Sequence, residues 1–351
     1  APTVGLLDGR DLAAERFNLD RTIVIQDVSR IMIHHDAGPQ TIRWVAVRDA
    51  GVVDEVGFYP IHFHRNGDAT RGSVVEGVVV ERGRNRAFVP HGSNGVAMID
   101  CVAWDVVGTA FWWDPPESDS DTTHNSNDIS WEHCLAALVR PADDRGFRLS
   151  GFELGAGSGN RAIGCTAVGV LGQKDASGFH WPEAANDNDG GTVWLFEDNV
   201  AHNNRVHGIF TWQNDDGFHP IDRFVAYHND GSGIDHGAYV NRYRYRDLVL
   251  QGNGGPAIQS HATGRGDTVE FVLAVTDGIL LIPRHTLDGG PVVYRSCRFT
   301  GVVVDQRTDG GETASTQVFE DCDLTPDDFT IETIVDGTIL RIVEDGVARW
   351  E

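Results

Sequence analysis

Residues 98–104 read MIDCVAW, and the same frame returns as WEHCLAA at 131–137 and as AIGCTAV at 162–168. All five cysteines of the chain fall in one column of this imperfect repeat. The column, as aligned on the sequence, consists of Trp44, Gly77, Cys101, Cys134, Cys165, Asn199, Phe224, Leu248, Phe271, Cys297 and Cys322. Successive members are 23 to 34 residues apart, a spacing typical of solenoids built from stacked units.

The repeat units contain short β-branched runs such as GVVV, separated by Gly, Asn and Asp, and these are signals of strands and turns. A propeller blade needs about 40 residues, so the shorter intervals exclude a propeller. The predicted fold class is an all-β, right-handed parallel β-helix, in which equivalent residues stack at about 4.8 Å. The cysteines then form an inward column of structural thiols rather than a redox or metal site, and Asn199 is a candidate for an asparagine ladder.

We expect one domain over residues 1–351, because a chain of this length buries a large core without cross-links. Its expected parts are an N-terminal cap at 1–30 with a short helical pattern at 11–19, β-helix coils at 31–325, and a C-terminal cap at 326–351. The last part alternates apolar and polar residues around Asp345-Gly346, which predicts a hairpin. Such a hairpin covers the exposed edge of the final coil.

The chain is strongly acidic, with 52 Asp and Glu against 28 Lys and Arg and a formal net charge of −24. A surface of this charge repels nucleic acid and anionic membranes, although solubility alone also explains it. No run of 18 apolar residues occurs, so we expect no membrane insertion. Because of the negative charge, we also expect no nucleic-acid partner. A chain that begins Ala-Pro-Thr is consistent with a processed form, and we expect a secreted, extracellular protein.

Side chains fill the inside of a β-helix, so function is expected on an outer face beside the longer intervals. The segment FYPIHFHRNGD at 58–68 aims His62 and His64 at one face of a strand. His91 follows about one coil later, which brings a third imidazole near them. The three histidines are candidate ligands for a divalent metal ion of unknown identity, with Asp68 or Asp114 completing the site. The alternatives are an acid–base pair and a surface that binds polar sugar groups.

The segment 61–91 is locally basic, and its arginines either belong to a solvated loop or bind a carboxylate-bearing ligand such as a uronic-acid polymer. Tryptophans and histidines in or beside the long intervals either pack in the core or contact sugar rings. The candidate substrate-binding residues are Arg65, Arg84, Arg86, Trp112, Trp113, His180, Trp181, His207 and Trp212. Carboxylates near these rings, suited to glycoside hydrolysis, are Asp114, Glu183, Asp215 and Asp216.

Together, YPIHFHRNGD at 59–68 and HGSNGV at 91–96 resemble the β-helix region of the cell-surface hyaluronidase family, with its hyaluronan-binding and fibrocystin-like members. The resemblance covers roughly 56–212, although Thr109 stands where the family usually carries a histidine. It implies a right-handed parallel β-helix that binds or cleaves a hyaluronan-like polysaccharide with a divalent cation. The shared motifs contain the candidate catalytic residues His62, His64, Asp68, His91 and Asp114.

The leading hypothesis is a secreted enzyme, a glycoside hydrolase or a polysaccharide lyase, that cleaves an acidic, uronic-acid-containing glycan. His62, His64 and His91 bind a metal ion or act as acid and base in this hypothesis. One alternative is a non-catalytic carbohydrate-binding or adhesion module, and another is a structural β-helix with a buried histidine pair. The sequence leaves the individual glycan and the oligomeric state open.

Overall fold

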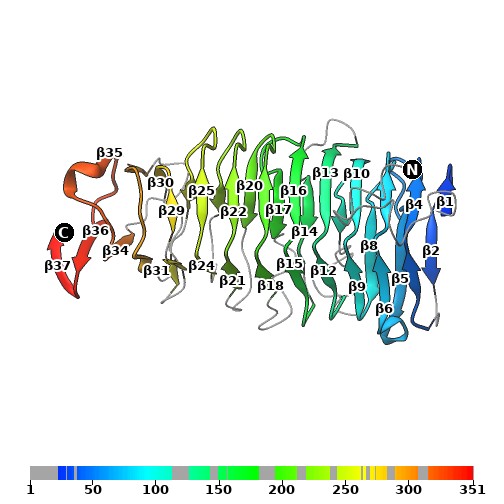
Figure 1. Ribbon diagram of the computed structural model, residues 1–351. Helices are drawn as coiled ribbons and strands as arrows, with labels where there is room; N and C mark the ends of the chain where they lie inside the picture. Colours follow the sequence, from blue (N-terminus) through cyan, green and yellow to red (C-terminus); the bar gives the residue numbers. More distant parts are fainter. Residues whose placement is uncertain are drawn as a thin grey trace, which may run out of the picture.

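Three long parallel sheets wind along a single axis, with β1 and β2 at one end and β36 and β37 at the other (Figure 1). The computed structural model describes residues 23–28, 30–34, 38–112, 126–142, 149–155, 157–181, 194–211, 219–237, 243–261, 264–265, 269–272, 274–282, 289–306 and 315–350. In these ranges the regular structure is β-strand, apart from the 3₁₀ turns η2 (Asp68–Thr70) and η5 (Pro326–Asp328). The predicted parallel β-helix is therefore confirmed.

Up to β32, each coil of the β-helix contributes one strand to each of three sheets in the order A, B, C, and from β33 to β36 the described strands alternate between sheets B and C. Sheet A consists of β1 (Ile23–Gln26), β4 (Val45–Arg48), β7 (Val79–Glu81), β10 (Val102–Val107), β13 (Leu135–Arg140), β16 (Thr166–Val170), β19 (Val200–His202), β22 (Val225–Tyr227), β25 (Val249–Gln251) and β29 (Val275–Thr276). Most of these strands are only three or four residues long, so the corners on either side of them lie close together.

Sheet B forms the face that carries the histidine motif. It consists of β2 (Ile31–His34), β5 (Ile61–Gly67), β8 (Phe88–Ser93), β11 (Phe111–Trp112), β14 (Ser150–Glu153), β17 (Ser177–Trp181), β20 (His207–Thr211), β23 (Ile234–His236), β26 (Ile258–Ser260), β30 (Ile279–Leu281), β33 (Val302–Asp305) and β35 (Phe329–Thr333). The pairing is parallel throughout this sheet.

Sheet C closes each coil. It consists of β3 (Thr41–Arg43), β6 (Ser73–Glu76), β9 (Val96–Ile99), β12 (Ser130–Glu132), β15 (Arg161–Ile163), β18 (Leu195–Glu197), β21 (His219–Asp222), β24 (Tyr243–Arg246), β28 (Val269–Val272), β32 (Val292–Arg295), β34 (Thr316–Glu320), β36 (Ile339–Glu344) and β37 (Val347–Trp350). A separate antiparallel pair joins β27 (Gly264–Arg265) and β31 (Gly289–Gly290).

The corner between sheet C and sheet A is turned by a single residue with positive φ. The described corner residues are Trp44, Gly77, Asp100, His133, Gly164, Asp198, Arg223, Asp247, Ser296 and Asp321, with φ between 51° and 64°. Glycine adopts this left-handed conformation freely, and Asp tolerates it better than most residues. The Asp and Gly residues that precede the cysteine column are therefore the local cause of the bend.

The residue after this corner points into the core. Sγ of Cys101, Cys134 and Cys165 lies 3.3, 3.3 and 3.4 Å from a backbone oxygen of the preceding coil. All five cysteines are free, four are buried and Cys322 is half-buried. The cysteine column is thus an inward file of thiols.

Strand register corrects three positions of the column predicted from the sequence. The pairings of Val79 with Val102 and of Ala46 with Val79 make Val45 and Val78, not Trp44 and Gly77, equivalent to Cys101. Trp44 and Gly77 are the corner residues one position earlier.

The third correction replaces Phe271 with Ala274, because Val275 follows Ala274 and pairs with Val249. Phe271 belongs to an inward aromatic stack on sheet C instead. Its ring lies 4.6 Å from that of Tyr245 and 5.0 Å from that of Tyr294, with nearly parallel planes.

The asparagine ladder lies elsewhere than predicted. Asn199 is buried and bonds to the neighbouring coil's backbone, accepting from the amide of Cys165 at 2.8 Å and donating to the carbonyl of Ala162 at 2.9 Å. The ladder runs through Asn204, Asn229 and Asn253, where each amide Nδ2 donates to Oδ1 of the next residue at 2.9 Å.

The final strands form an antiparallel hairpin. β36 pairs with β37 around Asp345 and Gly346, which both have positive φ, as a tight hairpin turn requires. The predicted helical pattern at 11–19 lies outside the described residues. The division into caps and coils at residues 30 and 325 stays a prediction.

We expect Asp247→Val to lower the free energy of unfolding by about 1–3 kcal/mol, because a β-branched residue is strained at φ 56°. Asp247→Gly keeps the corner and stays within about 1 kcal/mol of the wild type. Urea unfolding of both variants measures the difference. Equal stability of the two variants would show that the corner does not need the left-handed conformation.

Candidate functional site

Alternation along β5 and β8 places the histidines on the outer face of sheet B. Ile61 and Phe63 belong to the hydrophobic core, so the residues between and after them face outward. In the strand register His34 pairs with His64, and His64 pairs with His91. Three histidines from successive coils therefore lie in one row, with His62 beside it.

The rings of this histidine cluster, His62, His64 and His91, are in mutual contact. Ring centroids are 4.9 Å apart for His62 and His64, 5.0 Å for His64 and His91, and 6.0 Å for His62 and His91. One ring nitrogen of each histidine lies within 4.8 Å of the others. The prediction that the sequence brings these imidazoles together is confirmed, and His34 adds a ring stacked at 5.0 Å on His64.

His62 is the most constrained member of the cluster. Its side chain is fully buried, and Nδ1–H donates a hydrogen bond to the carbonyl oxygen of Gly57 at 3.2 Å. Nε2 is buried and has no hydrogen-bond partner among the described residues. Burial lowers the pKa of His62 to about 3, and the charges of His64 and His91 act in the same direction. His62 is therefore a neutral imidazole whose free lone pair faces the cluster.

An aromatic wall adjoins the cluster. The ring of Tyr59 meets the rings of His62 and Trp112 edge-on, with centroid distances of 4.8 Å and 5.8 Å. The guanidinium of Arg86 lies 3.6 Å from the ring centroid of Trp112 and 6.0 Å from that of Tyr59. This is cation–π geometry, which holds the guanidinium plane against the indole. A positive charge and an aromatic surface are thus fixed next to the imidazoles.

The other predicted arginines lie at the periphery. Arg84 is about half exposed, with a 3.5 Å ion pair to Asp27. Arg65 is exposed and has φ 50°, in the irregularity of β5 between His64 and Gly67. The basic segment therefore divides into one arginine packed beside the cluster and others directed to solvent.

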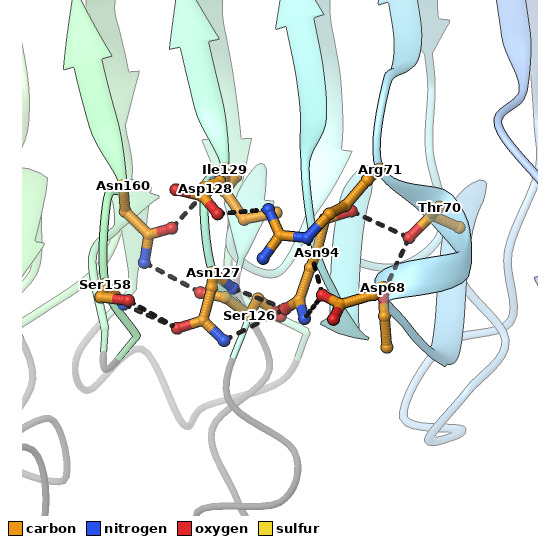
Figure 2. Close-up of polar contacts among 11 residues, drawn as sticks. Asp68, Thr70, Arg71, Asn94, Ser126, Asn127, Asp128, Ile129, Ser158 and Asn160 are labelled. Carbon is orange, nitrogen blue, oxygen red and sulfur yellow. Dashed lines mark hydrogen bonds and ion pairs between the residues drawn. The ribbon is translucent and has the colours of Figure 1, made fainter.

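Asp68 lies on the turn after β5, in a polar network that crosses successive coils (Figure 2). Its carboxylate accepts from Asn94 Nδ2 at 2.8 Å and from Arg71 Nε at 2.7 Å. The hydrogen bond from Asn94, and then the contact with Arg71, lower the pKa of Asp68. Arg71 also pairs with Asp128. The set of possible metal ligands contains the three histidines and not Asp68.

Further along sheet B, His180 and His207 lie on the outer face and Trp181 does not. The ring centroids of His180 and Phe210 are 5.3 Å apart. Nε2 of His207 lies 3.3 Å from Oδ2 of Asp235. Trp181 lies in the core against Phe196, so its assignment as a substrate-binding residue is corrected to a packing role.

Several predicted site residues lie outside the described residues. These are Trp113, Asp114, Glu183, Trp212, Asp215 and Asp216. Sequence reasoning missed His34, Tyr59, Asp235 and His261, which the register brings to the same outer face. Within the described part of the chain we find no helix with the length and hydrophobicity needed to span a bilayer.

Two solved structures resemble this chain over most of its length. The A-module of mannuronan C-5 epimerase AlgE4 from Azotobacter vinelandii has 11% sequence identity and a TM-score of 0.47, and the match covers 92% of each chain. The Agl-KA catalytic domain has 10% identity and a TM-score of 0.39, covering 91% of this chain and 61% of that chain.

The segment with the histidine cluster matches a family in sequence as well. Residues 28–141 match the family described as CEMIP beta-helix. Cell surface hyaluronidase CEMIP2 of Homo sapiens is 26% identical over a segment that covers 30% of this chain and 10% of that protein. The chain thus spans about a tenth of the length of this relative. The resemblance carried by the histidine motifs is confirmed, and residues 28–141 are similar to the β-helix region of the CEMIP family.

Proposed function

We propose that this protein is an extracellular enzyme that cleaves an acidic, uronic-acid-containing polysaccharide at the histidine cluster. The observation that carries the proposal is the convergence of His62, His64 and His91, with a buried and free Nε2 on His62. The family match of residues 28–141 and the hyaluronidase name of the human relative support the choice of a hyaluronan-like glycan.

The cluster fits a divalent transition metal ion. His62 donates from Nδ1 to a backbone carbonyl, which fixes the tautomer with its lone pair on Nε2, as metal-bound histidines require. Three imidazoles are a common ligand set for such ions and leave a position open. A bound ion would supply Lewis-acid polarisation of a substrate oxygen.

The residues of the chain divide the remaining tasks. We assign Arg86 to the uronate carboxylate and Trp112 to the sugar ring, with Arg65 and Arg84 as outer contacts. Hydrolysis needs a group that protonates the leaving oxygen, whereas β-elimination needs a base for the proton at C5. The imidazoles of His64 and His91 suit either transfer, and Asp68 and Asp114 remain candidate carboxylates for it.

We expect His62→Ala and His91→Ala to lower kcat/KM by about 100-fold or more, because each removes a group that binds or moves a proton at the reacting centre. Reducing-end release from hyaluronan, chondroitin, alginate and pectin measures cleavage, with and without EDTA. Absorbance of the unsaturated product distinguishes a lyase from a hydrolase.

The matched control for these variants is His133→Ala, since His133 is an exposed histidine at a corner of the coil. It should retain wild-type activity. Full activity in both cluster variants would remove the site assignment. Binding without cleavage in the wild type would favour the alternative of a carbohydrate-binding module.

We also expect zinc to raise the thermal unfolding midpoint of the wild type at pH 7, because a ligand that binds only the folded state stabilises it. The shift should be lost in His62→Ala and kept in His133→Ala. Differential scanning fluorimetry, with cobalt and manganese in parallel, measures it. No shift with any of the three ions would argue against the metal and leave the acid–base role.

The neutral state of His62 predicts a loss of stability in acid. Its pKa is about 3 in the folded protein and 6.5 when unfolded, so the unfolded chain binds the extra proton as pH falls below 6.5. His62 therefore removes about 1.4 kcal/mol of stability per pH unit between those values. Urea unfolding at pH 6.5 and 4.5 measures how much the free energy of unfolding falls between the two pH values. This fall should be smaller for His62→Ala than for the wild type. Equal differences would contradict a neutral, buried His62.

A further inference from the structure

A second polar group lies on the outer face of sheet B, beyond β17. It consists of His207 at the start of β20, Asp235 of β23, Gln259 of β26 and His261 just after β26. Strand pairing joins Phe210 to Asp235 and Asp235 to Gln259, so the group continues the outward row that contains His180. We call it the Asp235 centre. It lies outside the residues that match the CEMIP family.

The carboxylate of Asp235 is surrounded by nitrogen atoms. Oδ2 lies 3.3 Å from Nε2 of His207 and 3.3 Å from the amide nitrogen of Gln259. Oδ1 lies 3.5 Å from Nε2 of His261, which in turn is 2.9 Å from the Gln259 amide. The centre is therefore a connected group of polar side chains with Asp235 in the middle.

The orientation of His207 is set by the backbone. Its Nδ1 accepts a hydrogen bond from the amide of Ser232 at 3.2 Å, so the neutral ring carries its proton on Nε2 and directs it at Asp235. Burial lowers the pKa of His207 to about 4, which keeps the ring neutral at pH 7. His207 thus directs a neutral N–H group at the carboxylate of Asp235.

Burying the polar side chains of the Asp235 centre costs free energy that a surface with only a structural role would not need to spend. The side chains of Asp235, His207 and His261 are 8%, 11% and 12% exposed, so the carboxylate is largely desolvated but the group still reaches the surface. Two coils further on, the same outward row contains Leu280 and Val303, which fill their positions without buried charge. An apolar residue would serve the fold equally well at position 235.

The Asp235 centre and the histidine cluster share one face of the β-helix. Sheet B runs from β8 through β11, β14, β17 and β20 to β23, which separates His91 from Asp235 by five strand steps. At the usual inter-strand spacing this is about 24 Å along the axis. The outward row between the two sites consists of Trp112, Glu153, His180 and Phe210. This arrangement suits a chain-like ligand that lies along the axis.

We propose that the Asp235 centre binds the hydroxyl groups of a neutral sugar unit in the same polysaccharide chain that reaches the histidine cluster. This inference rests on the proposed function. A carboxylate accepts hydrogen bonds from hydroxyl groups, and an imidazole and an amide donate them. A buried negative charge repels a uronate, so the unit bound here is an uncharged one. The uronate is left to Arg86 at the other site.

The test compares short and long hyaluronan oligosaccharides. A tetrasaccharide reaches only one site, whereas a dodecasaccharide engages both, and the second contact adds affinity through its high effective concentration. Isothermal titration calorimetry at pH 7 gives the dissociation constant of each oligosaccharide. The quantity compared is the ratio of the tetrasaccharide constant to the dodecasaccharide constant. We expect Asp235→Asn to reduce this ratio roughly 10- to 100-fold, the value of hydrogen bonds to a charged group. Cleavage of the tetrasaccharide should be unchanged.

The matched control is Asp247→Asn, an acidic residue at a sheet C corner where Asn also tolerates positive φ. It should keep the wild-type ratio. If Asp235→Asn does not fold, as judged by circular dichroism, His261→Gln takes its place in the same comparison. A ratio equal to that of the control overturns the inference, whatever His62→Ala does.

The outcomes separate the two proposals. Loss of the length dependence in Asp235→Asn, with full activity in His62→Ala, supports this site and removes the catalytic assignment. Cleavage that depends on His62 but not on chain length or Asp235 does the reverse. No binding of hyaluronan, chondroitin, alginate or pectin oligosaccharides overturns both.

Discussion

One left-handed residue at the corner between sheet C and sheet A keeps every coil in register with the next. The corner is too short to absorb an extra residue, so the long insertions lie on either side of sheet B, as residues 49–60 between β4 and β5 and the interval from β11 to β12 illustrate. Register on sheet B is then inherited from coil to coil. Because side chains alternate along a strand, this register decides which residues meet on the outer face. His64 meets His91, and Asp235 meets Gln259, for this reason.

The parts of the structure that repeat could be predicted from the sequence. The cysteines mark the inward column because they follow an Asp, His, Gly or Ser corner, and the spacing of His62 and His64 fixes their common face. Trp44 and Gly77 were placed one position off because a valine-rich run follows each of these corners, and such a run does not mark which residue is the first to point inward. Trp181 was misjudged because alternation depends on knowing where β17 begins, and the sequence does not mark that boundary. Asp235 gave no signal, since its partners come from the two neighbouring coils, 24 to 28 residues away in the sequence.

Charge is distributed unevenly over this strongly acidic chain. On sheet C, arginines pair with carboxylates across neighbouring strands, as Arg43 does with Glu76 and Arg295 with Glu270. Such exposed pairs contribute little stability, but they neutralise one another locally. Arg86 differs, because its guanidinium lies against Trp112 instead of a carboxylate. An anionic polymer approaching sheet B therefore meets a positive charge that is oriented by an aromatic ring.

Burial of polar side chains distinguishes the outer face of sheet B from an ordinary solvated surface. A solvated imidazole retains its hydrogen bonds to water, whereas Nε2 of His62 is removed from water and has no replacement among the described residues. The Asp235 carboxylate is desolvated in the same way, although its partners are in place. A fold that requires only stacked coils gains nothing from either group. Their retention on one face and in one row, with Trp112, Glu153, His180 and Phe210 between them, is what selection for a long polar ligand would produce.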